Sequence, residues 1–194
     1  MENARKYAYF ILGVNGGGKS TLRDYQLNIE KNITVIDPDQ IAKKFSLNSV
    51  SAGKKAITLF RQCLANKNSF LFEGTLSDLS MLKRIHCAKN HGYIIKAYFI
   101  GLDNCELHKA RVAERVLNGG HYIDPSDIER RYFKSLSNIQ CLFSVVDQLK
   151  VMDNTNVAKP HDLVLLIIRN KLVKQAKNIP NWVTEYVIKP FKNQ

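Results

Sequence analysis

Residues 13–20 read Gly-Val-Asn-Gly-Gly-Gly-Lys-Ser, which is the phosphate-binding P-loop pattern. The apolar run at 9–12 precedes this stretch and a helix-like segment begins near Thr21, a placement that a glycine-rich turn with a surface lysine does not explain. Glycines let backbone N–H groups curl around phosphates, Lys19 can reach the β and γ phosphates, and the Ser20 hydroxyl can ligate Mg²⁺. The N-terminus of the next helix points at the same anion. We therefore expect ATP or GTP, with Mg²⁺, to bind at Gly13, Asn15, Gly16, Gly17, Gly18, Lys19, Ser20 and Thr21.

The composition predicts one domain without a membrane segment. The chain has 194 residues, of which 45% are hydrophobic, enough for a substantial core. The longest apolar runs, such as 163–168, are far shorter than a membrane span, and the N-terminus lacks the apolar stretch of a signal peptide. We expect a cytoplasmic protein, with export into another cell left open. The four cysteines form no Cys-x-x-Cys pair, which favours reduced, buried thiols over disulfides or zinc.

The formal net charge is +12, which favours a negatively charged partner such as nucleic acid, a membrane surface or a phosphorylated small molecule. Lysines and arginines recur along the whole chain, with a modest excess at 169–177. We interpret that excess as a solvated helix face rather than a nucleic-acid groove. The charge permits nucleic acid as a partner without favouring it.

Strand and helix signals alternate along the chain. Strands are predicted at 7–13, 33–37, 69–73, 93–100, 149–152 and 163–168; helices at 21–30, from 39 onward, at 52–66, after 77 or 78, at 106–117, at 126–140 and around Trp182. This alternation predicts an α/β fold of the P-loop NTPase, nucleotide-kinase-like type, with a mostly parallel sheet and helices on both faces. We expect a single domain over 1–194, with a helical lid at about 103–140 and a C-terminal extension at about 156–194.

Three segments with chemically useful side chains follow predicted strands directly. They are the P-loop, Asp37-Pro38-Asp39 and Glu73-Gly74-Thr75. Ligands of such sheets bind at the carboxyl ends of the strands. The three segments should therefore line one cleft.

Two aspartates follow the second strand. Transfer of a γ-phosphoryl group needs charge neutralisation and a carboxylate beside the acceptor hydroxyl, and Asp39 is placed to accept or orient that proton. Its alternative role is to cap the following helix. Asp37 resembles the acidic end of a Walker B strand and can contact Mg²⁺ through water, or it is a turn aspartate before proline.

Glu73 emerges from the apolar run 70–72, where a carboxylate is costly to bury unless it faces a cleft. We therefore interpret Glu73 as a functional residue that faces the cleft. Thr75 and Ser77 can hydrogen-bond a substrate, although loop hydroxyls more often satisfy nearby backbone.

Cations come from the two helices after the fourth strand. Arg111 and Arg115 share one helix face, and Arg130 and Arg131 lie on the next helix. The glycine-bearing stretch 118–121 between them suggests a lid that closes arginines over phosphates. Arg115 is the favoured lid arginine, followed by Arg131.

Two points about this lid stay open. Arg111 has the alternative of pairing on the surface with Glu114 or Asp127. His121, in the hinge, is a candidate phosphate or substrate ligand, or simply an exposed loop histidine. The other histidines and cysteines show no metal-ligand spacing, so no zinc site is predicted.

Taken together, these motifs resemble the zeta toxins and zeta-toxin-like P-loop kinases of bacteria. The resemblance covers about residues 7–155 and lies in GVNGGGKST, VIDPDQIA, FLFEGTLS, ARVAERVLNGGHYI and ERRYFKSLSNI, in that order. It implies ATP- and Mg²⁺-dependent phosphorylation of UDP-N-acetylglucosamine on a sugar hydroxyl, and a protein antitoxin is compatible with it. Lys19 and Ser20 then hold nucleotide and metal, Asp39 is the catalytic carboxylate, Glu73 and Thr75 face the amino sugar, and Arg115 is a lid arginine. The toxins have a second lid arginine, for which this chain offers His121 or Arg131.

Other functions are compatible with the same P-loop. They are a kinase for another small hydroxyl compound such as a nucleoside or an antibiotic, a polynucleotide end kinase, and a non-catalytic nucleotide switch. A switch would keep Lys19 but would not need Asp39 or the lid arginines, so their joint presence favours catalysis.

Overall fold

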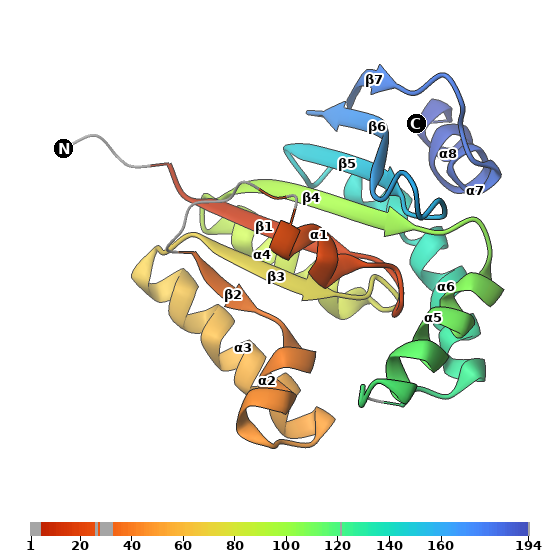
Figure 1. Ribbon diagram of the computed structural model, residues 1–194. Coiled ribbons are helices and arrows are strands. Elements are labelled where there is room, and N and C mark those ends of the chain that lie inside the picture. Colours follow the sequence, from red (N-terminus) through yellow and green to blue (C-terminus); the bar gives the residue numbers. More distant parts are fainter. Residues whose placement is uncertain (1–4, 26, 28–32, 121, 194) are drawn as a thin grey trace.

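A seven-stranded sheet forms the centre of the molecule in a computed structural model that describes residues 5–25, 27, 33–120 and 122–193. The spatial order is β2-β3-β1-β4-β5-β6-β7 (Figure 1). The strands are β1 Tyr7–Leu12, β2 Thr34–Ile36, β3 Phe70–Gly74, β4 Ile94–Gly101, β5 Gln148–Asp153, β6 Asp162–Ile168 and β7 Lys171–Gln175. The first five are parallel, and β6 and β7 are antiparallel to their neighbours. The predicted α/β fold with a mostly parallel sheet is confirmed.

Helices cover the two faces of this sheet unequally. They are α1 Lys19–Tyr25, α2 Pro38–Phe45, α3 Ser49–Asn66, α4 Leu79–Asn90, α5 Cys105–Leu117, α6 Pro125–Ser137, α7 Asn181–Val183 and α8 Lys189–Lys192, with a 3₁₀ turn at Ile139–Leu142 and a π turn at Thr184–Ile188. Figure 1 shows α1 in front of the strands and α4 behind them. Buried residues of α2 to α6 join one apolar cluster, whereas Leu22 of α1 joins the other. Among the described residues, α1 is therefore the helix that packs on the face of the sheet opposite α4.

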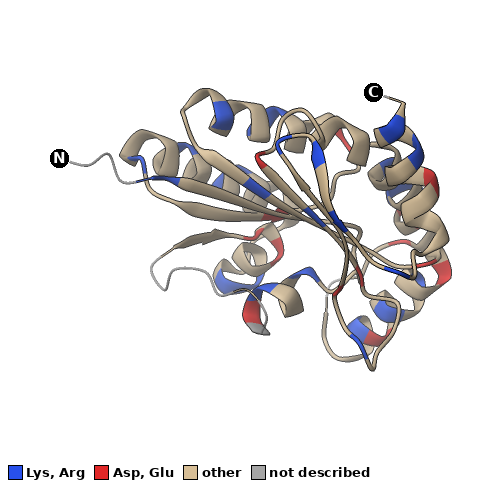
Figure 2. Cartoon of the chain, turned by 90° about the horizontal axis from the view of Figure 1, so that it is seen from above, with Lys and Arg blue, Asp and Glu red and all other residues tan. Residues whose placement is uncertain are grey.

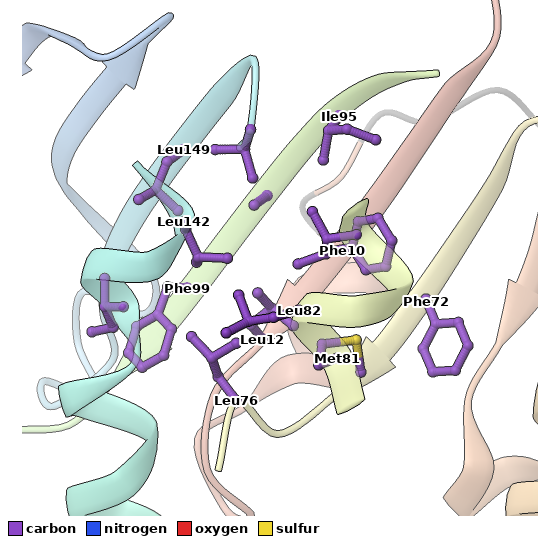
Figure 3. Packing of buried hydrophobic residues seen from close by; sticks show 14 of the residues in the cluster. Phe10, Leu12, Phe72, Leu76, Met81, Leu82, Ile95, Phe99, Leu142 and Leu149 are labelled. Atoms are coloured by element: carbon purple, nitrogen blue, oxygen red, sulfur yellow. The ribbon is translucent and has the colours of Figure 1, made fainter. Parts of the chain in front are cut away.

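The main core lies on the face that carries α4. Alternate residues of a strand point to opposite faces, so Phe10 and Leu12 enter this core while Tyr9 and Ile11 enter the smaller one. Figure 3 shows Phe10 beside Ile95 and Phe72 near Met81 of α4. β1 is buried on both faces, as the apolar run at its position predicted. It is therefore a rigid base for the loop that follows it.

The segment at 169–177 corrects one prediction. Instead of a solvated helix face, its residues Lys171–Gln175 form β7, which is exposed along its whole length. Arg169 and Asn170 both have positive φ, 47° and 57°, which is the requirement of a tight two-residue hairpin turn. The scattered lysines alone resembled a helix face, but this turn joins β6 to an edge strand.

The other predicted elements are confirmed with shifts of a few residues. The helix predicted at 126–140 ends at Ser137 and continues as the 3₁₀ turn. The helix predicted at 21–30 is observed as α1, and its positions 26 and 28–30 lie outside the described residues. The predicted tail helix is confirmed around Trp182, whose indole Nε1–H donates to Asp153 Oδ1 at 3.0 Å.

The basic residues are spread along the chain as expected, whereas only some of the cysteines are buried. Figure 2 shows lysine and arginine on helices and strands throughout the chain. All four cysteines are free; Cys63 and Cys105 are buried, but Cys141 is exposed, against the expectation of buried thiols. None of the helices formed by the described residues is both long and apolar enough to cross a bilayer.

Candidate functional site

The P-loop begins where β1 ends and continues directly into α1. Gly13 has φ +142°, and a Cβ there would lie 2.3 Å from the carbonyl oxygen of Ile100, so only glycine fits. The N–H of Gly17 donates to the Val14 carbonyl at 3.1 Å and closes the turn. The loop therefore has the curled shape that its glycine pattern predicted.

Lys19, the first residue of α1, points its ammonium back onto the loop. Its Nζ donates to the carbonyls of Gly13 at 2.9 Å and Val14 at 3.1 Å. Burial lowers the pKa of Lys19, and the nearby Glu73 opposes that shift. A phosphate group at the loop would offer Lys19 charged oxygens in place of these two neutral carbonyls.

Behind the loop lies a buried cluster of two carboxylates and one arginine. Glu73, only 3% exposed, accepts a hydrogen bond from Ser20 Oγ at 3.2 Å through Oε2 and binds Arg23 through Oε1. The same Arg23 nitrogen, Nη1, lies 3.1 Å from Asp37 Oδ2. Burial, with the negative charge of Asp37, raises the pKa of Glu73 to about 7. Arg23 thus joins the carboxyl ends of β2 and β3 to α1.

Asp37 and Asp39 have different roles at the start of α2. Asp37 Oδ1 accepts from the backbone N–H groups of Asp39 at 2.9 Å and Gln40 at 3.3 Å, which makes Asp37 the N-cap. The alternative assignment of the cap to Asp39 is therefore wrong, because the helix begins one residue earlier, at Pro38. The Asp39 side chain is 66% exposed, and its Oδ2 lies 3.9 Å from Arg115 Nη1.

Two arginines of α5 face the same cleft as Asp39. Arg115 reaches toward Asp39 from the last turn of the helix. Arg111 Nη2 donates to the backbone carbonyl of Asn154 at 2.9 Å, rather than to Glu114 or Asp127 as the surface alternative had it. That alternative failed because α5 turns Arg111 toward the carboxyl end of β5.

On α6, Arg131 Nη1 donates to Asn15 Oδ1 at 3.2 Å and so contacts the P-loop, whereas Arg130 pairs with Asp127 on the surface. Of the two candidates for the second lid cation, Arg131 therefore lies at the cleft. His121, the other candidate, lies outside the described residues. The Thr75 and Ser77 hydroxyls are 2.9 Å apart and bond to each other, and Thr75 lines the cleft.

These residues surround one cleft of about 640 Å³. Its lining includes the P-loop, the starts of α1 and α2, the end of β3 and the three arginines, as the carboxyl-end rule predicted. It also includes Asn154, Val157, Pro160 and His161 from the segment between β5 and β6. This last wall, and Arg23, were missing from the sequence-based site. The position of Asn154 just after β5 was the available signal for the wall.

Oxygen ligands suitable for Mg²⁺ meet at this cleft. Ser20 and Glu73 provide a hydroxyl and a carboxylate, and Asp37 lies beside them, which matches the hard oxygen ligands that Mg²⁺ prefers. No group of three or more His, Cys, Asp or Glu side chains within 5–25, 27, 33–120 and 122–193 is placed to hold a metal ion. Mg²⁺ needs no such group, because it commonly binds one or two protein oxygens together with substrate phosphates.

Comparison with known proteins decides the family. The sequence matches the zeta toxin family over residues 1–163. The chain belongs to the zeta toxin family. A protein of Haemophilus influenzae whose function is uncharacterised is 38% identical over 130 residues, which are 64% of this chain and 91% of the relative.

Two solved structures share the fold of this zeta toxin family member. The PezAT chromosomal toxin–antitoxin system of Streptococcus pneumoniae includes a chain with TM-score 0.59 and 20% identity, covering 79% of this chain and 69% of that one. The AvrRxo1-ORF1:-ORF2 complex with ATP includes a chain with TM-score 0.71 and 13% identity, covering 88% of this chain and 61% of that one. At these identities the likeness shows the fold alone. Family membership and the P-loop kinase fold make this zeta toxin family member a phosphotransferase.

Proposed function

We propose that this zeta toxin family member is an ATP- and Mg²⁺-dependent kinase that phosphorylates a hydroxyl of a nucleotide sugar such as UDP-N-acetylglucosamine. One observation carries the proposal. The exposed carboxylate of Asp39 faces Arg115 in the cleft that the P-loop also lines. Phosphoryl transfer needs a carboxylate beside the attacking hydroxyl and a loop that binds the phosphates of the donor nucleotide, both in one cleft.

The donor half consists of the P-loop, Lys19 and Ser20. Lys19 would exchange its bonds to the carbonyls of Gly13 and Val14 for bonds to the β and γ phosphates. Ser20 and, through water, Asp37 would hold Mg²⁺, which when bound supplies positive charge against the phosphate oxygens. ATP as the donor is supported by the ATP complex of the AvrRxo1 structure.

The acceptor half consists of Asp39, Glu73 and Thr75. Asp39 would accept the proton of the attacking hydroxyl, for which its exposed carboxylate is free of the helix cap that Asp37 provides. Both carboxylate oxygens of Glu73 are already bound, one by Ser20 and one by Arg23. Glu73 would therefore contact the acceptor only through the lone pairs that these two bonds leave free. Thr75 would offer its hydroxyl to the sugar once its bond to Ser77 is exchanged.

Arg115 and Arg131 would neutralise the charge that develops on the transferred phosphoryl group. They approach the cleft from α5 and α6, the two helices of the predicted lid at 103–140. Arginine suits this role because its planar guanidinium binds two phosphate oxygens at once. A small closure of these helices would bring both side chains onto the phosphates.

The experiment is a transfer assay with purified protein, γ-labelled ATP, Mg²⁺ and a panel of acceptors. The panel holds UDP-N-acetylglucosamine, nucleosides, aminoglycosides and 5′-hydroxyl oligonucleotides. Asp39→Asn should lower kcat by about 10²–10⁴-fold, the usual range for loss of a general base, with nucleotide affinity little changed. Lys19→Ala should lose nucleotide affinity as well.

Matched controls remove comparable charges outside the cleft. Glu106→Gln, at an exposed carboxylate on α5, and Lys54→Ala, on α3, should both keep full turnover. No product from any acceptor would refute the kinase proposal. Product from oligonucleotides alone would replace the nucleotide sugar with a polynucleotide end, and full turnover by Asp39→Asn would remove the general-base role.

We also propose a protein antitoxin as a partner, which the PezAT toxin–antitoxin system supports by family likeness. Induced expression in a bacterial host should arrest growth, and Asp39→Asn should relieve the arrest at equal protein levels. Equal arrest by both forms would show that toxicity does not depend on the proposed chemistry.

A further inference from the structure

The P-loop is held from outside by side chains of two other segments. Three of its peptide carbonyls accept side-chain hydrogen bonds: Asn15 from His108 Nδ1 at 2.9 Å, Gly17 from Asn154 Nδ2 at 3.0 Å, and Gly18 from His161 Nε2 at 2.9 Å. His108 lies on α5, while Asn154 and His161 begin and end the segment between β5 and β6. We call Asn154 and His161 the β5–β6 clamp.

The geometry of the peptide bond turns these contacts into an orientation of the loop. A trans peptide is planar, so the carbonyl of one residue and the N–H of the next point in opposite directions. The Gly17 carbonyl is held by Asn154, and the Gly18 carbonyl is held by His161 together with the Leu22 backbone N–H of α1, which donates to it at 3.0 Å. These carbonyls therefore direct the N–H groups of Gly18 and Lys19 to the other side. Those are the N–H groups with which a P-loop binds phosphate oxygens.

Asn154 is fixed by four hydrogen bonds. Its backbone N–H donates to Gly101 at 3.0 Å and its backbone carbonyl accepts from Arg111 at 2.9 Å. Its side-chain Oδ1 accepts from the His161 backbone N–H at 3.1 Å, while Nδ2 holds Gly17. Every polar group of this residue is used, so its side chain has one orientation.

His161 occupies a costly conformation. It is buried and has φ +54°, a left-handed backbone value that a residue with a side chain rarely adopts. Its Nδ1 is buried and has no hydrogen-bond partner among the described residues. The hydrogen bond from Nε2 to Gly18 is therefore the polar contact that the imidazole ring makes there. Strain of this kind persists where the surrounding structure requires it, and it is concentrated at functional sites.

The clamp lies so close to the loop that position 18 has no room for a side chain. A Cβ on Gly18 would lie 2.4 Å from Asn154 Nδ2 and 3.0 Å from His161 Nε2. Only glycine allows the two residues to approach this closely. The third consecutive glycine of the loop is therefore needed for the clamp as well as for its own φ of +92°.

We propose that Asn154 and His161, supported by His108, are positioning residues for phosphoryl transfer: they hold the carbonyls of the P-loop outward so that its N–H groups face the phosphates of the donor nucleotide. Their side chains donate to the backbone of the loop, so they would act on the reaction through the loop. The inference rests on the proposed donor role of the P-loop and extends the site to the segment between β5 and β6.

The test measures ATP and ADP affinity by calorimetry in variants of the full chain. His161→Phe keeps a ring of similar size but removes the donor, and should weaken both affinities about 3–10-fold, the range for one lost hydrogen bond. His161→Gln places an amide N–H near the position of Nε2 and should restore most of the affinity. If His161 only stabilised the fold, His161→Phe would lower the melting temperature in parallel with the ATP affinity, and His161→Gln would not restore ATP binding.

His91→Phe is the matched control, because His91 also bonds a backbone carbonyl, that of Cys87, but outside the cleft. It should bind ATP like the wild type. Asn154→Ala removes the contact to Gly17 and the acceptor of the His161 backbone N–H, so it should weaken ATP binding at least as much and serves as the test if His161→Phe does not fold. Wild-type affinity in a folded His161→Phe or Asn154→Ala protein would overturn the inference alone. A wild-type protein that binds neither ATP nor GTP would overturn the proposed function and this inference together.

Discussion

Arg23 offers the sharpest test of how the cleft is built. Its side chain is 8% exposed and binds Glu73 and Asp37, whose side chains are 3% and 6% exposed. Arg23→Met would keep the apolar part of the side chain but leave two buried carboxylates without their common counter-charge. Breaking a buried pair in this way costs about 3–5 kcal/mol of unfolding free energy.

The loss should depend on pH in a definite direction. The pKa of Glu73 is raised to about 7 in the folded protein against 4.5 without the fold, so the folded state binds more protons between these values. Stability then falls as pH rises through this window, and the fall should be steeper without Arg23. We expect the loss in Arg23→Met to be larger at pH 8 than at pH 5.5 by roughly 1 kcal/mol.

The assay is urea denaturation followed by circular dichroism at both pH values. Arg130→Met is the matched control, because Arg130 pairs with Asp127 while both are half exposed, and such pairs contribute about 0–1 kcal/mol. Equal losses in the two variants, or a loss in Arg23→Met that does not change between pH 5.5 and pH 8, would refute the reasoning. The double variant Arg23→Met/Glu73→Gln should recover part of the stability, since it also removes one of the two stranded charges.

Three further predictions concern stability. The wild type should lose about 2 kcal/mol between pH 5.5 and pH 8 through Glu73 alone, so Glu73→Gln should show a flatter urea-denaturation profile over that range; an equally steep profile would assign the dependence to other groups. Phe10→Ala, in the core between Phe70 and Phe72, should cost about 3–5 kcal/mol by chemical denaturation, and a loss below 1 kcal/mol would mean that the core collapses around the gap. Trp182→Phe removes the bond to Asp153 but keeps most of the ring, so it should cost about 1 kcal/mol, whereas Trp182→Ala should cost at least twice as much; similar losses would show that the indole N–H, and not packing, holds the C-terminal helix.

The fold was predictable because its central strands are apolar runs that are followed directly by glycine-rich or charged residues. Residues 9–12 ahead of the P-loop and 70–72 ahead of Glu73 give both the buried strands and the positions of their carboxyl ends. The parallel order then brings distant segments to one edge of the sheet. The sequence could not indicate that β7 is a strand, because its residues are exposed and carry no alternating apolar pattern.

The site was predictable where residues act through their own motif, and less so where they act through a neighbour. Lys19 and Asp39 belong to recognisable stretches, whereas Arg23 is one more basic residue on a helix until the fold places Glu73 beside it. His161 follows a proline in an irregular segment, and its contact to Gly18 spans 143 positions of the chain. Such long-range contacts depend on tertiary geometry that local patterns do not contain. The roles assigned to these residues in catalysis stay predictions.

The two edges of the sheet bear on whether copies of this protein stick together. An unpaired strand offers a row of N–H and C=O groups to any passing chain, so open edges invite aggregation. β2 limits this exposure by being only three residues long. β7 is longer and open, but it carries Lys171 and Lys174, whose like charges repel a second copy of the same strand. The positive charge that identifies no particular ligand therefore has a consequence at this edge: it disfavours pairing of β7 with the β7 strand of a second copy.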